Sequence, residues 1–234
     1  LYDGQGQQAR LLRDWRMRTD ARITADELAL TMRGLLGAHA EDVNAVSALS
    51  TVPAVLRELR VMLGRYYASV PRVIVEPGVR TGVPLLVDNP KEVGADRVIN
   101  TLAAHHLHST ACVVVDFGTS TNIDVISAKG EFLGGVFARA AALRKVELVR
   151  PRSVIGKNTV ECLQSGILYG FAGQVDGLVR RIVSELDSTG AGPVTVIATG
   201  GLAPLVVAES ETIDHHRPDL TLLGLRLVFE RNTR

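Results

Sequence analysis

Aromatic residues, cysteines and net charge are all scarce in this sequence of 234 residues. Aromatic residues make up 4% of the chain, and the formal net charge at pH 7 is +1. A nearly neutral chain gives no electrostatic reason to expect a nucleic acid or a membrane surface as partner. The longest apolar runs, such as ACVVVDF at residues 111–117, are much shorter than the roughly 18 residues that a membrane-spanning helix needs. We therefore expect neither nucleic-acid binding nor a membrane protein.

The composition is that of a globular protein, with 46% hydrophobic and 22% charged residues. The length allows one large domain or two smaller ones. Cys112 lies in an apolar, strand-like run and Cys162 in a helical run. We expect both to be buried free thiols, which fits a reducing cytoplasm.

Strand-like and helix-like segments alternate along the chain. Thr24 and Glu27 form a capping box ahead of an amphipathic segment, and Pro53 stands where a helix should begin. This alternation predicts an α/β protein with at least partly parallel sheets, and we place a domain boundary between residues 105 and 106. The main predicted strands are 9–19, 45–50, 72–76, 110–118, 121–128, 131–138 and 193–201, and the main predicted helices are 27–37, 53–67, 89–106, 160–187 and 220–231.

The sharpest local motif is VVVDFGTST, residues 113–121. An apolar strand ends in Asp116, and Gly118 and the hydroxyl of Thr119 follow it. A carboxylate in this place can hold a cation, and a glycine beside it lets phosphate oxygens approach backbone N–H groups. Alternatively, the strand leaves the core through a turn that needs no ligand.

The motif GADR, Gly94 to Arg97, falls in the first turns of the helix predicted over residues 89–106. Glycine inside a helix is less favourable than alanine by about 1 kcal/mol, so its presence needs a reason. Asp96 could complement the helix dipole while Arg97 is solvated. Alternatively, Asp96 is a general base and Arg97 binds a carboxylate with two hydrogen bonds.

Three further groups have both a structural and a functional interpretation. Asn158 or Thr159 is a good helix N-cap, and the N–H groups at that helix start would also suit an anion. The glycines Gly200 and Gly201 end the motif ATGG and suit a turn or close packing against a flat ring such as adenine. The histidines at 105, 106 and 108 are expected to form a polar helix end rather than a metal site, and those at 215 and 216 a solvated loop.

Six motifs occur together and in a particular order. They resemble successive motifs of the bacterial type III pantothenate kinases, and the resemblance runs from residue 14 to residue 232. The motifs are NPKEVGADRVIN (89–100), VVVDFGTSTNIDV (113–125), GEFLGGVFA (130–138), PRSVIGKNTVECLQSG (151–166), GFAGQVDGLV (170–179) and ATGG (198–201).

The resemblance implies an actin-like (ribonuclease H-like) fold, in which two related α/β domains hold ATP in the cleft between them. It implies an enzyme that phosphorylates the terminal hydroxyl of pantothenate with ATP, giving 4'-phosphopantothenate in the first step of coenzyme A synthesis. It further implies a cytoplasmic homodimer. The alternatives are a non-catalytic or regulatory relative, or a kinase of another small alcohol on the same fold.

The resemblance also implies roles for particular residues. Asp96 would be the catalytic base, and a monovalent cation, K⁺ or NH₄⁺, would bind at Asp116. A divalent cation such as Mg²⁺ would accompany ATP. Pantothenate would be bound by Gly94, Ala95, Asp96, Arg97 and Thr159, and ATP by Gly118, Thr119, Gly200 and Gly201.

Two departures from the family pattern lead to one more expectation. The family begins with a strand and a phosphate loop of the form D-x-G-N-T, whereas this sequence begins at Leu1 in a turn-like segment. The family also has a Pro-Gly segment where this chain passes from Ala138 into a basic stretch. We expect the expressed protein to contain a phosphate-loop strand before Leu1 and a short segment after Ala138.

Overall fold

The computed structural model describes residues 1–4, 6–118, 120–138, 147 and 149–233. It is a mixed α/β structure, which confirms the predicted class at this level. The chain forms two compact units. Unit 1 comprises Leu1–Thr81, Gly94–Asp96 and Leu225–Arg234, and unit 2 comprises Gly82–Val93 and Arg97–Gly224. The predicted boundary between residues 105 and 106 falls inside helix α3 (Ala95–His108), and the division into two related domains stays a prediction.

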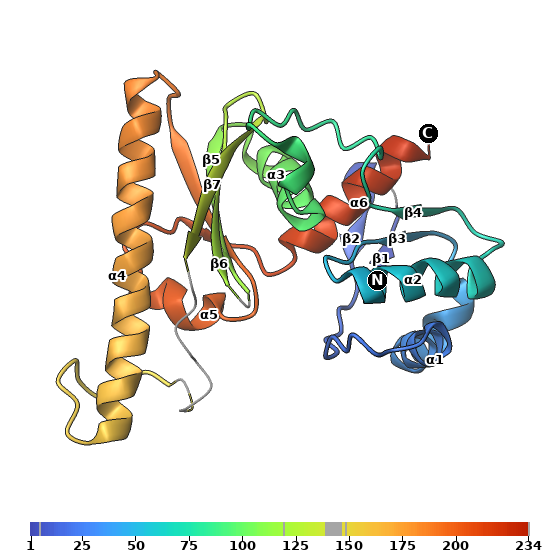
Figure 1. Ribbon diagram of the computed structural model, residues 1–234, viewed down its shortest axis with the longest axis horizontal. Helices are drawn as coiled ribbons and strands as arrows, with labels where there is room; N and C mark the ends of the chain where they lie inside the picture. Colours follow the sequence, from blue (N-terminus) through green and yellow to red (C-terminus); the bar gives the residue numbers. More distant parts are fainter. Residues whose placement is uncertain (5, 119, 139–146, 148, 234) are drawn as a thin grey trace. The chain divides into compact units, whose positions relative to one another are not determined.

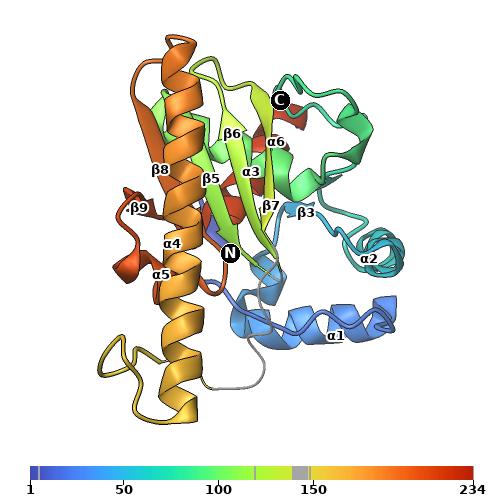
Figure 2. The ribbon, with the colours of Figure 1, turned by 60° about the vertical axis from the view of Figure 1, so that its left-hand side comes forward.

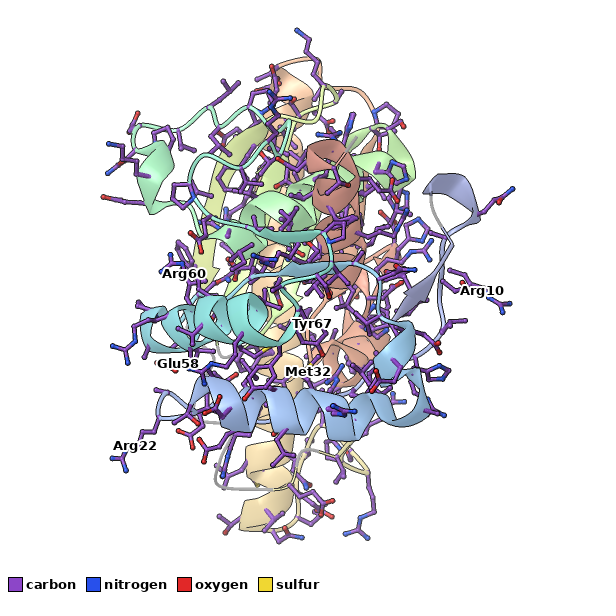
Figure 3. All side chains as sticks on the ribbon, turned by 90° about the vertical axis from the view of Figure 1, so that its right-hand side faces the viewer. Arg10, Arg22, Met32, Glu58, Arg60 and Tyr67 are labelled. Atoms are coloured by element: carbon purple, nitrogen blue, oxygen red, sulfur yellow. The ribbon has the colours of Figure 1, made fainter. Side chains whose placement is uncertain are left out.

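Unit 1 is built around two helices that pack on each other. In the capping box, the Thr24 backbone N–H donates to Glu27 Oε2 at 2.9 Å, and the Glu27 N–H donates to Thr24 Oγ1 at 3.3 Å. Figure 3 shows Met32 and Tyr67 on the inner side of these helices, where they pack against the core. Among the elements of unit 1 are α1 (Ala25–Leu36), α2 (Pro53–Tyr66), the parallel strands β3 (Val46–Ala48) and β4 (Arg72–Ile74), and the short helices η1 (Gly6–Gln8) and η2 (Gly37–Asp42).

The strand predicted over residues 9–19 is much shorter than expected. Only β2 (Arg10–Leu11) is formed there, and it pairs with β1 (Tyr2–Asp3) in an antiparallel ribbon. Of residues 12–19, only Trp15 is partly buried. A segment that offers almost no buried face gains little from strand pairing, so the strand-like sequence of this segment was misleading.

Unit 2 contains a five-stranded sheet with the order β7-β6-β5-β8-β9. The first three strands in that order pair antiparallel, while β5–β8 and β8–β9 are parallel, as the alternating sequence pattern predicted. The strands are β5 (Ala111–Phe117), β6 (Thr121–Ile126), β7 (Phe132–Ala138), β8 (Val194–Thr199) and β9 (His215–His216).

Helices cover both faces of this sheet (Figures 1 and 2). Odd-numbered residues of β5, such as Val113 and Val115, pack with helix α4 (Thr159–Ser188). Even-numbered residues, such as Val114, pack with α3 and with Leu220 at the start of α6 (Leu220–Asn232). The remaining helices are η3 (Pro90–Glu92), α5 (Ala203–Val206) and η4 (Val207–Glu209).

Two predictions about individual side chains are wrong. Cys112 is buried as expected, but Cys162 is exposed because it lies in the first turns of α4, where most residues face solvent. His215 and His216 form the edge strand β9 and not a loop, although His215 is exposed as predicted. His215 stacks on His108 with ring centroids 4.7 Å apart. Within the described part of the chain, no helix has both the length and the apolar character needed to cross a membrane.

Candidate active site

The GADR motif lies at the start of α3, but the helix begins later than predicted. It starts at Ala95, so Gly94 precedes the helix and does not weaken it. A Cβ atom on Gly94 would lie 2.5 Å from Asp96 Oδ1, so the missing side chain leaves room for this carboxylate. Asp96 is half-buried in the first helical turn, where the positive end of the helix dipole favours a negative charge.

Arg97, the next residue, is not solvated. Its Nε donates to Asp124 Oδ1 at 2.7 Å, and its Nη2 lies 2.5 Å from the same oxygen. The side chains of Arg97 and Asp124 are 11% and 1% exposed, so this is a buried ion pair. The guanidinium carbon also lies 5.0 Å from the ring centroid of Phe132 and 4.5 Å from that of Phe137.

Asp116 lies near the end of β5, next to the turn that follows β8. Gly200 in that turn has φ +91°, and a Cβ atom there would be 2.5 Å from Asp116 Oδ1 and 2.6 Å from the carbonyl oxygen of Phe117. A carboxylate oxygen and a carbonyl oxygen therefore both lie close to Gly200, where any side chain would clash with them. Gly118 is exposed, and its N–H donates to the carbonyl oxygen of Ser120 at 3.1 Å.

Asp116 Oδ1 and the Phe117 carbonyl oxygen are the oxygen donors that lie close to Gly200. Carboxylate and carbonyl oxygens are ligands for hard cations, and carbonyl oxygens in particular replace the water around K⁺. Among the residues that the structure describes, no group of three His, Cys, Asp or Glu side chains could hold a metal ion.

Strand register brings the two aspartates near each other. Asp116 pairs with Asn122 across β5 and β6, and Asp124 follows two residues later on β6, opposite Val114. Since Val114 packs on the α3 side, both aspartates lie on that same face. Diagonal neighbours of this kind have Cα atoms about 7–8 Å apart. The Arg97–Asp124 pair and the oxygens beside Gly200 are thus neighbouring features of one sheet.

An apolar pocket of about 180 Å³ opens near the same edge of the sheet, on the α4 side. Gly201 leads directly into Leu202, which lines it, and the Leu202 N–H donates to the Phe117 carbonyl at 3.2 Å. An ion pair between Arg150 and Glu209, 3.0 Å apart, also belongs to the lining. The other lining residues include Phe117, Thr121, Leu168, Phe171 and Leu205.

The structure does not bring Thr159 to the start of α3. Thr159 is the first residue of α4, and Asn158 caps that helix by accepting from the Glu161 N–H at 2.9 Å, as predicted. In Figures 1 and 2 the first turns of α4 extend past the sheet and away from α3. The predicted ATP contact of Thr119 and the expected segment after Ala138 lie outside the described residues.

Sequence reasoning missed Asp124, Phe132 and Phe137. A signal for Asp124 was present, because it is a lone carboxylate in the apolar strand TNIDVI. A charged residue there must find a partner when the strand is buried. No comparable signal marks the two phenylalanines, whose role depends on where α3 packs.

Comparisons with known proteins agree with the motifs. A family model described as "Type III pantothenate kinase" matches residues 2–181. A type III pantothenate kinase of Saccharopolyspora erythraea is 80% identical over 234 residues, covering 95% of this chain and 88% of that protein. One of Rhodococcus jostii is 67% identical over 244 residues, covering 99% and 90%. One of Mycobacteroides abscessus is 59% identical over 244 residues, again covering 99% and 90%.

A solved structure of a Baf family protein from Campylobacter jejuni is 15% identical and covers 73% of this chain and 87% of that one. Its TM-score of 0.39 is too low to support a conclusion about the fold. The family model covers most of the chain, and the relatives align over nearly all of it. The predicted resemblance is therefore confirmed, and the chain belongs to the type III pantothenate kinase family.

Proposed function

We propose that this chain transfers the γ-phosphoryl group of ATP to the terminal hydroxyl of pantothenate, with Asp96 as general base and Arg97 as a ligand of the substrate's polar groups. This is the reaction of the family, the first step of coenzyme A synthesis. The assignment of residues rests on the position of Arg97. Its side chain is paired with Asp124, on the same face of the sheet as Asp116. Arg97, on the acceptor side, would thereby lie near the residues that bind the phosphates.

The acceptor side of the site is the start of α3. Asp96 would accept the proton of the attacking hydroxyl, and Gly94 and Ala95 would offer backbone to pantothenate beside it. Gly94 supports this assignment, because a side chain there would displace the Asp96 carboxylate from its position. Phosphoryl transfer needs little covalent assistance, so a placed nucleophile and neutralised charge supply most of the rate enhancement.

The phosphate side would be formed at the ends of β5 and β8. Gly200 and Gly201 would offer backbone N–H groups to phosphate oxygens, and Thr119 a hydroxyl. Gly118, whose N–H donates to Ser120, would let the phosphates come close to the backbone. Asp116 and the Phe117 carbonyl would hold K⁺ or NH₄⁺, which when bound supplies positive charge next to the phosphates. Mg²⁺ would arrive with ATP.

The base of ATP would lie in the apolar pocket beside Gly201. A volume of about 180 Å³ suits a flat ring rather than a whole nucleotide. The pocket lies directly after the paired glycines, so a ring placed there would leave the phosphates near the turn that faces Asp116.

The same proposal includes an actin-like fold and a cytoplasmic homodimer. An actin-like fold is supported by unit 2, where an antiparallel meander of three strands is extended by two parallel strands and covered by helices on both faces. A homodimer is supported by Thr159, since the start of α4 extends away from α3 in the same chain, and a cytoplasmic location is proposed from the family alone. A second copy would then supply Thr159 to the pantothenate site.

The proposal is tested by incubating the protein with ATP, Mg²⁺ and pantothenate, and by following the product by mass spectrometry. We expect 4'-phosphopantothenate to form, and to form faster when K⁺ or NH₄⁺ replaces Na⁺. Pantoate and glycerol at the same concentration serve as competing alcohols. Absence of product would favour a non-catalytic relative, and equal rates with all three alcohols would favour a kinase of another substrate.

A further inference from the structure

One group of residues on the sheet of unit 2 is not used by the proposed reaction. Asp124 on β6 and Gly135 on β7 are directly paired across the two strands, and Phe137 lies two residues beyond Gly135. Phe132 begins the same strand. These four residues surround the guanidinium group of Arg97, and we call them the Arg97 cradle.

The polar wall of the cradle fixes the plane of the guanidinium group. Both Nε and Nη2 of Arg97 contact a single oxygen of Asp124, at 2.7 Å and 2.5 Å. Two contacts to one acceptor restrain the guanidinium more than one contact does, and hydrogen bonds between charged groups are the stronger kind. Asp124 is 1% exposed, so water hardly competes for it.

The floor of the cradle requires a glycine. A Cβ atom on Gly135 would lie 2.2 Å from the Ile123 carbonyl oxygen, 2.8 Å from Arg97 Nη2 and 3.1 Å from Asp124 Oδ1. The first of these is a backbone atom of the neighbouring strand and cannot move aside cheaply. The second glycine of the motif FLGG is therefore required first by the Ile123 carbonyl oxygen, and the Arg97 guanidinium over the strand leaves little further room for a side chain.

The aromatic walls differ in exposure. Phe132 is 1% exposed and belongs to the core, whereas Phe137 is 66% exposed although it lies 4.5 Å from the guanidinium carbon. Cations are attracted to aromatic faces within about 6 Å of the ring centre. Phe137 thus contacts Arg97 from the solvent side, where a ligand would approach.

Stability alone does not explain why an arginine occupies position 97. Arg97 lies in the first turns of α3, where the positive end of the helix dipole disfavours a cation. A buried ion pair also adds little stability compared with apolar residues of similar size. An arginine placed there, in contact with an aromatic ring that faces solvent, is explained if its guanidinium also meets a ligand.

We propose that Asp124 is a positioning residue for phosphoryl transfer, holding Arg97 in the orientation in which it meets pantothenate, with Phe137 as the outer wall. This inference rests on the proposed function, because it assigns Arg97 to the pantothenate site. The inference adds Asp124 and Phe137 to the pantothenate site, where they act through Arg97 and do not contact ATP. Their loss is therefore expected to change the use of pantothenate more than the use of ATP.

A double-mutant cycle tests the inference, using Asp124→Asn, Arg97→Gln and the combined variant in the intact protein. We expect Asp124→Asn to lower kcat/KM for pantothenate by roughly tenfold to a hundredfold, as for a lost charge-assisted hydrogen bond. KM for ATP should change less than about twofold. In the Arg97→Gln background the same substitution should add almost nothing, because its effect passes through Arg97.

Three outcomes would overturn the inference. The first is a full additional loss in the Arg97→Gln background, and the second is equal loss for both substrates. The third is a lower melting temperature with unchanged kinetic constants, which would make the pair purely structural. A wild-type protein that does not phosphorylate pantothenate would instead contradict the proposed function, so the two failures are distinguishable.

If Asp124→Asn does not fold, the milder variant Phe137→Leu tests the inference. Phe137→Leu removes an exposed ring without leaving a buried charge unpaired. We expect it to raise KM for pantothenate by about 2- to 10-fold, since cation–π contacts at exposed sites are weak. Leu133→Ala is the matched control, because Leu133 is an exposed apolar residue of the same strand. Equal kinetic constants for Phe137→Leu and the wild type would overturn the inference.

Discussion

Asp124 and Asp116 lie on neighbouring strands and on one face of the same sheet, yet their surroundings differ. Asp124 is in the interior of β6, almost fully buried, and paired with Arg97. Asp116 is near the end of β5, half-buried, and lies against the space beside Gly200. A carboxylate in a strand interior must be paired because its desolvation is unfavourable. One at the carboxyl end of a parallel strand stays accessible to ligands, as is general for α/β sheets.

The largest difference that this comparison predicts is in stability. Asp124→Ala should lower the free energy of unfolding by about 3–5 kcal/mol, because it removes one partner of a buried ion pair. Asp116→Ala should lower it by less than about 1 kcal/mol, as is usual away from buried networks. Urea unfolding of the two variants measures both values. Equal losses would mean that the two aspartates do not differ in the way described.

The second prediction concerns ligand binding at Asp116. Asp116→Ala should weaken the affinity for ATP in K⁺ buffer by about 1.5–3 kcal/mol, the usual contribution of a charge-assisted contact. Affinity for pantothenate should change much less, because Arg97 is held by the other aspartate. Isothermal titration calorimetry with each ligand separates the two effects. Equal losses for ATP and pantothenate would contradict this division.

The third prediction uses the glycines that border Asp116. Gly200→Ala should destabilise the protein by about 1–3 kcal/mol, because alanine is strained at positive φ and its Cβ would meet the Asp116 carboxylate. Gly118→Ala is the matched control, since the nearest atom to its Cβ would be 3.5 Å away. Thermal melts of both variants, with and without ATP, provide the measurement. A Gly200→Ala protein as stable as the Gly118→Ala protein would show that the space beside Asp116 is not restricted.

The smallest expected effect is a pH dependence outside both aspartate sites. Burial lowers the pKa of His108, and the nearby charges of His215 and Arg217 lower it further, while Asp214 opposes them. The unfolded chain therefore binds a proton at a higher pH than the folded chain does, and stability falls as the pH drops below about 6.5. His108→Phe should flatten this part of the stability profile measured by urea unfolding between pH 5 and 7.5. An unchanged slope of the stability profile would mean that a group other than His108 causes the pH dependence.

Local signals in the sequence predicted local structure well. The capping box of Thr24 and Glu27, the helix start at Pro53 and the N-cap at Asn158 are all present as expected. The start of α3 was placed too early, because residues 90–92 form a separate short helix that a periodic pattern does not distinguish. Errors of this kind are typical where two helical segments follow each other closely.

Long-range pairing could not be predicted from the sequence. Arg97 and Asp124 are 27 residues apart, and their contact depends on how α3 packs on the sheet and on the register of β6. The space beside Gly200 likewise depends on the parallel pairing of β5 with β8. The motifs identified which residues matter, while the different burial of the two aspartates could be seen only in the fold.

The central claim is that the start of α3 carries the acceptor chemistry, and Asp96→Asn tests it most directly. Asparagine is nearly the same size but is no useful base, so we expect the rate of 4'-phosphopantothenate formation at saturating substrates to fall by about 10²- to 10⁴-fold. The melting temperature should stay close to that of the wild type. Asp187→Asn, at an exposed carboxylate near the end of α4, is the control and should retain full activity. An Asp96→Asn protein that phosphorylates pantothenate at nearly the wild-type rate would contradict the account.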